Sequence, residues 1–492
     1  MITLKNLTFG YADKLIFDQL SATLDSSWKM VLVGKNGRGK TTLMKLLSGE
    51  LKGSGQIWSD QLFRYFPQKI NDKTQLTQYI LDELYEAKAW EIKREMTVLG
   101  LSETILWQPF DTLSGGEQTK VLLIGLFLND AYFPLIDEPT NHLDIASRKQ
   151  IANYLKQQKS GYIVTSHDRQ FLEDVGDHLL AIERNDIQLL TTTYSGYEAD
   201  KKRRDAFEWS QNSKLKSEIS RLKKSAKAKA DWSQDREKEK SGNPKAKGSG
   251  SVLDKGFIGA RAARQMKKAK GLSQRMDKDI KEKAKLLKNI EKVDPLTMCY
   301  TPTHHHTVID EADIQLNRFD RTFFNPINIQ LNRGEVIAIT GENGIGKSLL
   351  LTYMYQLAIN KGLKVSYLSQ IDDDNQGDLY AFSEKYQLDY TEFLNNLRKL
   401  GVERHVFQQN IEEMSLGQQK KVALAKSLSE SATVYIWDEP LNYLDIDNQH
   451  QLVTLLKSIK PTMLVVEHDA RFISEVADDI IILEPTKNQE NK

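Results

Sequence analysis

Two glycine-rich stretches carry the residue types that bind phosphate groups. Gly34-Lys-Asn-Gly-Arg-Gly-Lys40-Thr41 and Gly341-Glu-Asn-Gly-Ile-Gly-Lys347-Ser348 both match G-x-x-x-x-G-K-[ST]. Glycines let backbone N–H groups curl around phosphates, and a following helix presents its positive end. The lysines are expected to reach the β- and γ-phosphates, and the Thr41 and Ser348 hydroxyls to bind Mg²⁺. Average composition gives roughly 0.02 chance matches in a chain of this length, so both stretches predict nucleotide-binding loops.

Paired acids follow apolar runs in both halves of the chain. Asp137-Glu138 follows Tyr132–Ile136, and Asp438-Glu439 follows Val434–Trp437. An acid at the end of a buried strand is the usual second Mg²⁺ contact in P-loop enzymes. A second carboxylate beside it can polarise an attacking water. A solvated strand end is the alternative, and it fits poorly because both acids lie directly on an apolar run.

Other motifs are weak alone and gain weight from repetition. Ser114-Gly-Gly at a helix start is a ready anion site, although such a turn is more often ordinary, and a lone histidine at a strand end is usually structural. The interval from the serine to the second acid is nevertheless 24 residues in both halves, and from that acid to the histidine it is 29 in both. Matched spacing is far stronger than any single motif. It brings these pairs into the prediction together: Gln68 and Gln370, Ser114 and Ser415, Glu138 and Glu439, His167 and His468.

These residues need a parallel sheet with helices to position them. Met30–Val33 and Val336–Ile339 are short apolar runs typical of buried strands, and each leads into a glycine-rich loop. The pattern predicts an α/β fold with two tandem P-loop ATPase domains joined by a long helical hairpin. We place the first module at 1–196, the linker at 197–303 and the second module at 304–492. A helical region is expected from Thr77 to about Leu106, and Trp90 and Trp107 are expected to lie in the core.

The linker has an unusual charge. Tyr197–Pro295 holds 29 Lys and Arg against 15 Asp and Glu, a net charge of +14, so the remainder carries −13. This asymmetry favours a polyanionic partner, nucleic acid first. A solvated spacer is the alternative, but a spacer needs neither one-sided charge nor apolar residues at an exposed tip. His304–His306 resembles a metal tract, but three adjacent histidines do not suit one ion, and we interpret them as a surface junction.

Apolar spacing predicts two antiparallel helices in the linker. Leu215, Ile219, Leu222 and Ala226 form a narrow seam on the first, which covers Glu198–Lys238. The second covers about 258–292, and the breaker cluster Ser241–Ser251 separates them. The tip, near 240–257, is expected to contact RNA mainly through phosphates, with Phe257 or Leu253 stacking on or wedging against bases. Its candidate contact residues are Lys245, Lys247, Val252, Leu253, Lys255 and Phe257.

Composition excludes several classes of protein. Cys299 is the single cysteine, which argues against a disulfide framework, a cysteine zinc site and an iron–sulfur cluster, and fits a reducing compartment. The first residues have no apolar core of signal-peptide type. The longest apolar run, near Val121–Leu128, is too short to cross a bilayer. We therefore expect a cytoplasmic protein, with no membrane partner and no DNA partner.

The repeated motifs resemble those of the ATP-binding cassette (ABC) superfamily in both modules. The glycine-rich loops look like Walker A loops, Ser114–Gly116 and Ser415–Gly417 like signature motifs, and the paired acids like Walker B with the catalytic carboxylate. Asp144 and Asp445 resemble D-loops. The resemblance implies catalytic roles for Glu138, Glu439, His167 and His468. It implies Mg²⁺ contacts by Thr41, Gln68, Asp137, Ser348, Gln370 and Asp438. It implies ATP contacts by Tyr11, Gly34, Asn36, Gly37, Gly39, Lys40, Thr41, Thr42, Ser114, Gly115, Gly116, Gly341, Asn343, Gly344, Gly346, Lys347, Ser348, Ser415, Gly417 and Gln418.

Two cassettes, a charged linker and no membrane span resemble the ABC-F group, and within it the antibiotic-resistance, Lsa-type proteins. The resemblance implies an ATPase that binds the 70S ribosome, touching 23S rRNA and tRNA. Its linker would enter through the tRNA exit site and relieve lincosamides, streptogramin A and pleuromutilins at the peptidyl transferase centre. The cassettes would pair within a monomer, each ATP lying between the Walker A loop of one and the signature motif of the other.

Three positions depart from the family pattern. Leu416 replaces the first signature glycine, Leu441 stands where the first module has Thr140, and Phe319 is a poor match for the adenine-stacking aromatic. A housekeeping ABC-F translation factor and a transporter ATPase subunit remain alternatives. Only 46 residues separate Gln68 from Ser114, and 45 separate Gln370 from Ser415. That leaves no room for the extra arm that housekeeping relatives insert, which favours the resistance interpretation.

Overall fold

The structure is a computed structural model that describes residues 1–11, 14–85, 88–129, 131–141, 143–183, 186–240, 295–318, 321–370 and 375–486. Contacts divide it into two compact units. One unit comprises Met1–Ser195 and Asp294–Lys492, and the other comprises Gly196–Val293. The tip residues and Phe319 lie outside the described residues. In the described part of the chain, no helix has the length and apolarity needed to cross a bilayer.

The first module is built on a six-stranded sheet in the order β5-β6-β7-β3-β8-β9. All neighbours are parallel except β8 and β9, and a three-stranded antiparallel sheet, β2-β1-β4, completes the module. Strands buried on both faces read as continuous apolar runs, as the sequence suggests. The strands are β1 (Ile2–Tyr11), β2 (Lys14–Leu24), β3 (Lys29–Val33), β4 (Ser54–Ser59), β5 (Leu62–Phe66), β6 (Tyr132–Asp137), β7 (Tyr162–Thr165), β8 (His178–Glu183) and β9 (Asp186–Leu190).

Helices follow the carboxyl ends of the parallel strands in the first module. α1 begins directly after the first glycine-rich loop, and α4 begins at the Ser-Gly-Gly motif. The α-helices are α1 (Lys40–Leu47), α2 (Thr77–Leu84), α3 (Ala89–Val98), α4 (Gly115–Leu126), α5 (Ile145–Gln157) and α6 (Arg169–Val175), with short 3₁₀ helices at Glu103–Trp107 and Phe110–Thr112.

The second module repeats this plan with a parallel sheet in the order β15-β16-β17-β14-β18. Its strands are β10 (Thr307–Ile314), β11 (Asn317–Arg318), β12 (Arg321–Thr322), β13 (Ile327–Asn332), β14 (Val336–Thr340), β15 (Val365–Leu368), β16 (Val434–Asp438), β17 (Met463–Val466) and β18 (Asp479–Ile482). Its helices are α9 (Lys347–Asn360), α10 (Leu379–Lys385), α11 (Tyr390–Lys399), α12 (Leu416–Ser429), α13 (Ile446–Ile459) and α14 (Ala470–Val476), with 3₁₀ helices at Arg404–Gln408 and Ile411–Glu413. The predicted fold of two tandem α/β domains is confirmed.

The expectation for two tryptophans is wrong. Trp90 is 58% exposed and Trp107 is 67% exposed. Trp90 lies in the first turn of α3, which turns Ile92 and Met96 into the core, and the Trp90 ring lies 5.7 Å from the Arg94 guanidinium carbon. Aromatic type alone does not fix burial, because a helix buries only the face that meets its neighbours. His304, His305 and His306 are exposed, as predicted for a surface junction.

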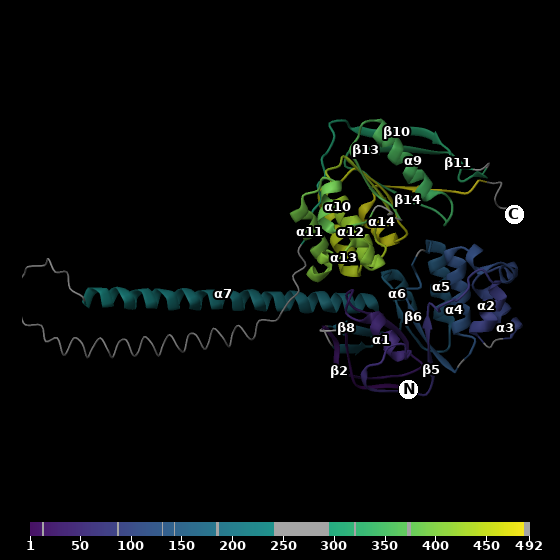
Figure 1. Ribbon diagram of the computed structural model, residues 1–492, viewed down its shortest axis with the longest axis horizontal. Helices are drawn as coiled ribbons and strands as arrows, with labels where there is room; N and C mark the ends of the chain where they lie inside the picture. Colours follow the sequence, from purple (N-terminus) through teal and green to yellow (C-terminus); the bar gives the residue numbers. More distant parts are fainter. Residues whose placement is uncertain are drawn as a thin grey trace, which may run out of the picture. The chain divides into compact units, whose positions relative to one another are not determined.

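The linker begins with one long helix, α7 (Tyr194–Lys240). Figure 1 shows it as a single uninterrupted coil. Ile219 is buried, and Leu215 and Leu222 are partly buried, in agreement with these three positions of the predicted seam. The side chain of Ala226 lies outside the described part of the chain. The first turn of α7 is held by Glu173 of α6, whose carboxylate accepts hydrogen bonds from the Ser195 backbone N–H and hydroxyl, both at 2.8 Å.

Candidate ATP sites

The glycine-rich loops turn at their predicted glycines. Gly39 and Gly346 cap α1 and α9 with φ of 97° and 96°, a region that residues with a Cβ avoid. A Cβ on Gly39 would lie 2.6 Å from Ile16 Cγ2, so the close approach of the neighbouring strand also requires glycine. Both loops therefore present backbone N–H groups at a helix N-terminus, as the sequence predicts.

The loop lysines lie folded over their own loops. Lys40 Nζ donates to the Gly34 carbonyl at 2.7 Å and to Asn36 Oδ1 at 3.3 Å. Lys347 Nζ donates to the Gly341 and Glu342 carbonyls, both at 2.8 Å. Burial lowers the pKa of both lysines, and the carboxylates Glu138 and Glu439, respectively, oppose that shift. Each lysine thus places a positive charge where a phosphate chain can replace carbonyl oxygens as its acceptor.

Asp137 lies at the end of β6 within a ring of hydroxyl groups. Its Oδ2 accepts from Thr41 Oγ1 at 2.7 Å and from the Tyr65 hydroxyl at 2.8 Å, and its Oδ1 accepts from Thr165 Oγ1 at 2.6 Å. In the second module, the Ser348 side chain is hydrogen-bonded to Asp438. Tyr65 and Thr165 are not predicted from the sequence, because their only signal is their place near the ends of β5 and β7.

The second acid of each pair faces its histidine. His167 Nε2 lies 3.3 Å from Glu138 Oε1, and the His167 backbone N–H donates to Glu138 Oε2 at 3.2 Å. His468 Nε2 lies 3.5 Å from Glu439 Oε1. The acids also share an uncommon backbone, since Glu138 has φ of 52° and Glu439 has φ of 50°. Such a left-handed conformation outside glycine is typical of residues held for a function.

Burial shifts the pKa values of Glu138 and His167 in the first module. It raises the pKa of Glu138 to about 8, although Lys40 opposes the rise. It lowers the pKa of His167 to about 3, with Lys40 acting in the same direction. Near neutral pH the pair therefore holds one proton on Glu138, beside a neutral imidazole. This arrangement suits a group that must take a proton from an attacking water once its surroundings favour the carboxylate.

We expect Glu138→Gln to raise the thermal stability of the protein without nucleotide. A carboxyl group with a raised folded-state pKa contributes stability below about pH 4.5 that is lost as the pH rises through about 8. The gain of the Gln variant over the unaltered protein should therefore grow between pH 5 and 8, to on the order of 5 °C in Tm. Scanning calorimetry across that range measures it, with Glu83→Gln on an exposed carboxyl as the control. A pH-independent difference would contradict the assigned burial cost.

The two glutamines differ in their contacts. Gln370 Nε2 donates to Glu439 Oε2 at 3.2 Å, and Asn442 Nδ2 donates to the same oxygen at 2.6 Å. In contrast, both amide atoms of Gln68 are buried without a hydrogen-bond partner among the described residues. A buried amide left without a partner calls for an explanation such as an ion or water.

Each glycine-rich loop contacts an aspartate of the other module. The Asn36 backbone N–H donates to Asp445 Oδ2 at 3.2 Å, and the Asn343 backbone N–H donates to Asp144 Oδ2 at 3.4 Å. These aspartates cap α13 and α5 through their other carboxylate oxygen. The reciprocal contacts place the modules head to tail, which is the arrangement that the resemblance implies.

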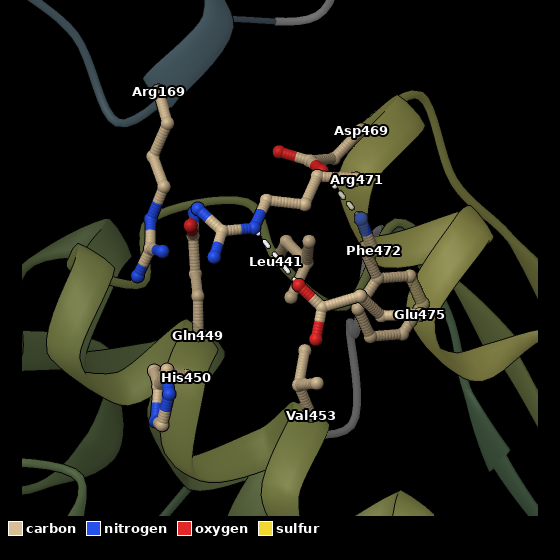
Figure 2. A pocket seen from close by; sticks show the side chains of 9 residues that line it. All are labelled: Arg169, Leu441, Gln449, His450, Val453, Asp469, Arg471, Phe472 and Glu475. Carbon is tan, nitrogen blue, oxygen red and sulfur yellow. Dashed lines mark hydrogen bonds and ion pairs between the residues drawn. The ribbon is translucent and has the colours of Figure 1, made fainter. Parts of the chain in front are cut away.

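A second contact between the modules lies beside a small pocket (Figure 2). Arg169 of α6 extends toward the start of α13, near Gln449 and His450, and its Nη2 donates to the Ile446 carbonyl at 3.2 Å (Figure 2). On the other wall, Arg471 Nε donates to Glu475 at 2.8 Å. Arg169, two residues after His167, is thus also part of the surface along which the two modules pair.

For other residues predicted to contact ATP, the structure shows local contacts only. Ser114 and Ser415 cap α4 and α12, each in a reciprocal capping box with the residue at the third helical position, Glu117 or Gln418. Tyr11 ends β1, half exposed, with its ring 5.0 Å from that of Phe9. The roles of these residues in ATP binding stay predictions.

Comparison with known proteins agrees with this geometry. A protein-family model described as "ABC transporter" matches residues 17–141 and 324–442, one copy in each module. The ribosome protection protein VmlR of Bacillus subtilis is 26% identical over 502 residues, covering 98% of this chain and 86% of VmlR. The erythromycin resistance ATP-binding protein MsrA of Staphylococcus epidermidis is 25% identical, covering 92% of this chain and 91% of MsrA. The chain is a dual-cassette ATP-binding protein of the ABC-F type.

A solved structure supports the fold alone. The archaeal ribosome recycling factor aABCE1, in complex with the stalk protein aP1, matches with a TM-score of 0.61 and 19% identity, covering 98% of this chain and 88% of that one. The cassettes of this ABC-F chain imply ATP hydrolysis, so the expectation of an ATP hydrolase is confirmed. The narrower resemblance to Lsa-type proteins stays a prediction.

Proposed function

We propose that this ABC-F protein binds the 70S ribosome in an ATP-dependent manner and protects it from antibiotics at the peptidyl transferase centre. The linker enters through the tRNA exit site and contacts 23S rRNA and tRNA, and the drugs relieved are lincosamides, streptogramin A and pleuromutilins. The observation that carries the proposal is a segment of net charge +14 between two ATP sites that contact each other. VmlR and MsrA, whose names refer to ribosome protection and erythromycin resistance, support it.

The residues fit Mg²⁺ in the first site. Thr41 and Asp137 offer hard oxygen ligands 2.7 Å apart, and the partnerless Gln68 amide supplies another oxygen. In the second site Ser348, Gln370 and Asp438 would hold the ion. When bound, Mg²⁺ neutralises charge on the β- and γ-phosphates. No cluster of His, Cys, Asp and Glu among the described residues offers a rival metal site.

Different residues of the chain bind phosphate, close each site and orient the attacking water. Lys40 and Lys347 release loop carbonyls and bind phosphate, while Ser415, Gly417, Ser114 and Gly116 close each site from the opposite module. Glu138 and Glu439 orient the attacking water, and the neighbouring histidines hold those carboxylates in place. Because each γ-phosphate touches both modules, ATP favours the closed pair, and this preference must amount to several kcal/mol to populate it.

Drug-susceptibility testing distinguishes an antibiotic-resistance protein from a housekeeping translation factor. Expression of the protein in a susceptible bacterium should raise the inhibitory concentrations of a lincosamide, a streptogramin A and a pleuromutilin by roughly ten-fold, equivalent to about 1.4 kcal/mol of drug binding. An aminoglycoside, which acts elsewhere on the ribosome, serves as the control drug. Unchanged susceptibility, together with ATP-dependent cosedimentation with ribosomes, favours the translation-factor alternative. Failure to cosediment with any nucleotide overturns both.

A further inference from the structure

The two ATP sites differ at one pair of residues behind the catalytic groups. In the first module, the hydroxyls of Thr140 and Ser166 lie 2.6 Å apart and are buried. The same two positions of the second module hold Leu441 and Glu467. A neutral link between hydroxyls is thus replaced by a buried carboxylate and an apolar side chain, while the surrounding spacing is kept.

Glu467 makes two short contacts with backbone N–H groups. It is 2% exposed. Its Oε1 accepts from the Leu441 backbone N–H at 2.9 Å, and its Oε2 accepts from the His468 backbone N–H at 2.6 Å. One carboxylate therefore joins the segment that follows Glu439 to the residue that faces Glu439. Hydrogen bonds to an ionised acceptor are stronger than neutral ones, so this link holds both segments firmly.

We propose that Glu467 is a positioning residue of the second ATP site, which fixes Glu439 and His468 relative to each other through the backbone of Leu441 and His468. The inference rests on the proposed roles of Glu439 and His468. It makes the second site dependent on a charge that the first site does not use. Because Glu467 is buried and contacts the backbone of Leu441 and His468, its effect is expected on the rate of the chemical step and not on ATP binding.

Titratable side chains from both modules lie around this carboxylate. Arg148, His167 and Asp168 of the first module and Asp469 of the second line the same small pocket as Glu467. Burial raises the pKa of Glu467 to about 7, Asp469 adds to the rise, and Arg148 and the two backbone N–H groups oppose it. Turnover at the second site is therefore expected to rise with pH through about 7, as the carboxylate forms.

The test isolates the second site in a Glu138→Gln background, in which Glu439 supplies the remaining turnover. Adding Glu467→Gln should lower kcat roughly ten-fold, because one backbone N–H then faces an amide NH₂ instead of an oxygen. KM for ATP should change less than two-fold, and the rise of kcat with pH should flatten. The reverse background, Glu439→Gln, isolates the first site, where Glu467→Gln should have little effect.

A paired exchange guards against a merely structural effect. Leu441→Thr with Glu467→Ser recreates the pair of the first module, and it should return kcat to within about three-fold of the parent with a flat pH profile near 7. The same variants are also measured in the otherwise unaltered chain, so the result stands if Glu138→Gln silences both sites. Unchanged kcat and pH profile in Glu467→Gln would overturn the inference. If Glu439→Gln itself leaves turnover unchanged, the proposed catalytic roles fail instead.

Discussion

Changing Glu138 and Glu439 together to Gln is expected to lower ATP turnover at least 100-fold while ATP-dependent ribosome binding persists. The amide keeps the shape of each side chain but no longer attracts a proton, and general-base catalysis typically contributes 10²- to 10⁴-fold. ATP binding depends on the loops and lysines, which the change leaves intact. The closed pair of modules should therefore form with ATP and fail to reopen.

Phosphate release and ribosome sedimentation measure the two halves of this result. The double variant should cosediment with 70S ribosomes when ATP is present and stay there during a chase with excess ADP. Glu83→Gln with Glu384→Gln, two exposed carboxyls in the two modules, provides a matched control that should turn over and dissociate normally. Normal turnover in the Glu138 and Glu439 variant would show that water is oriented by other groups.

Removal of residues 242–257 is expected to abolish drug protection while ATPase activity stays within about two-fold. In this interpretation the tip contacts RNA, and neither ATP site uses it. Inhibitory concentrations should fall to those of cells without the protein. A transporter ATPase subunit has no use for this segment, so retained protection after the deletion would favour that class.

A charge variant refines the same prediction. Replacement of Lys245, Lys247 and Lys255 by Gln should weaken ribosome binding and flatten its dependence on salt, because each lost phosphate contact removes one released counterion. Replacement of the exposed Lys52, Lys69 and Lys73 of the first module by Gln alters net charge equally and should have a much smaller effect. Equal weakening by both sets would indicate that only overall charge matters.

Much of the fold follows from sequence because chemistry and periodicity coincide in each module. A buried apolar strand, a glycine-rich loop and a helix follow one another twice, and parallel strands bring their carboxyl ends to one edge. This geometry brought Thr41, Asp137 and Glu138 together, as predicted. It also joined His167 to Glu138, across 29 residues, because β6 and β7 are neighbours.

The remainder depends on contacts that no local pattern encodes. Tyr65 reaches Asp137 because β5 pairs with β6, and a single tyrosine in a strand gives no sign of this. Trp90 looks like a core residue by type, yet α3 buries its opposite face. The left-handed backbone of Glu138 and Glu439 runs against the propensity of glutamate, and the backbone N–H of each pairs with the end of the neighbouring strand. Nothing in the local sequence around Glu467 indicates its two contacts with the backbone N–H groups of Leu441 and His468.

The attachment of the first turn of α7 to α6 has a geometric consequence. Glu173, which holds the first turn of this helix, belongs to α6, and α6 begins two residues after His167. A straight helix of 47 residues is about 70 Å long at 1.5 Å per residue. Tilting its root by about 5° would sweep its far end through roughly 6 Å over that length. If the proposed closure moves α6 by an ångström, the displacement would be amplified several-fold along the length of α7.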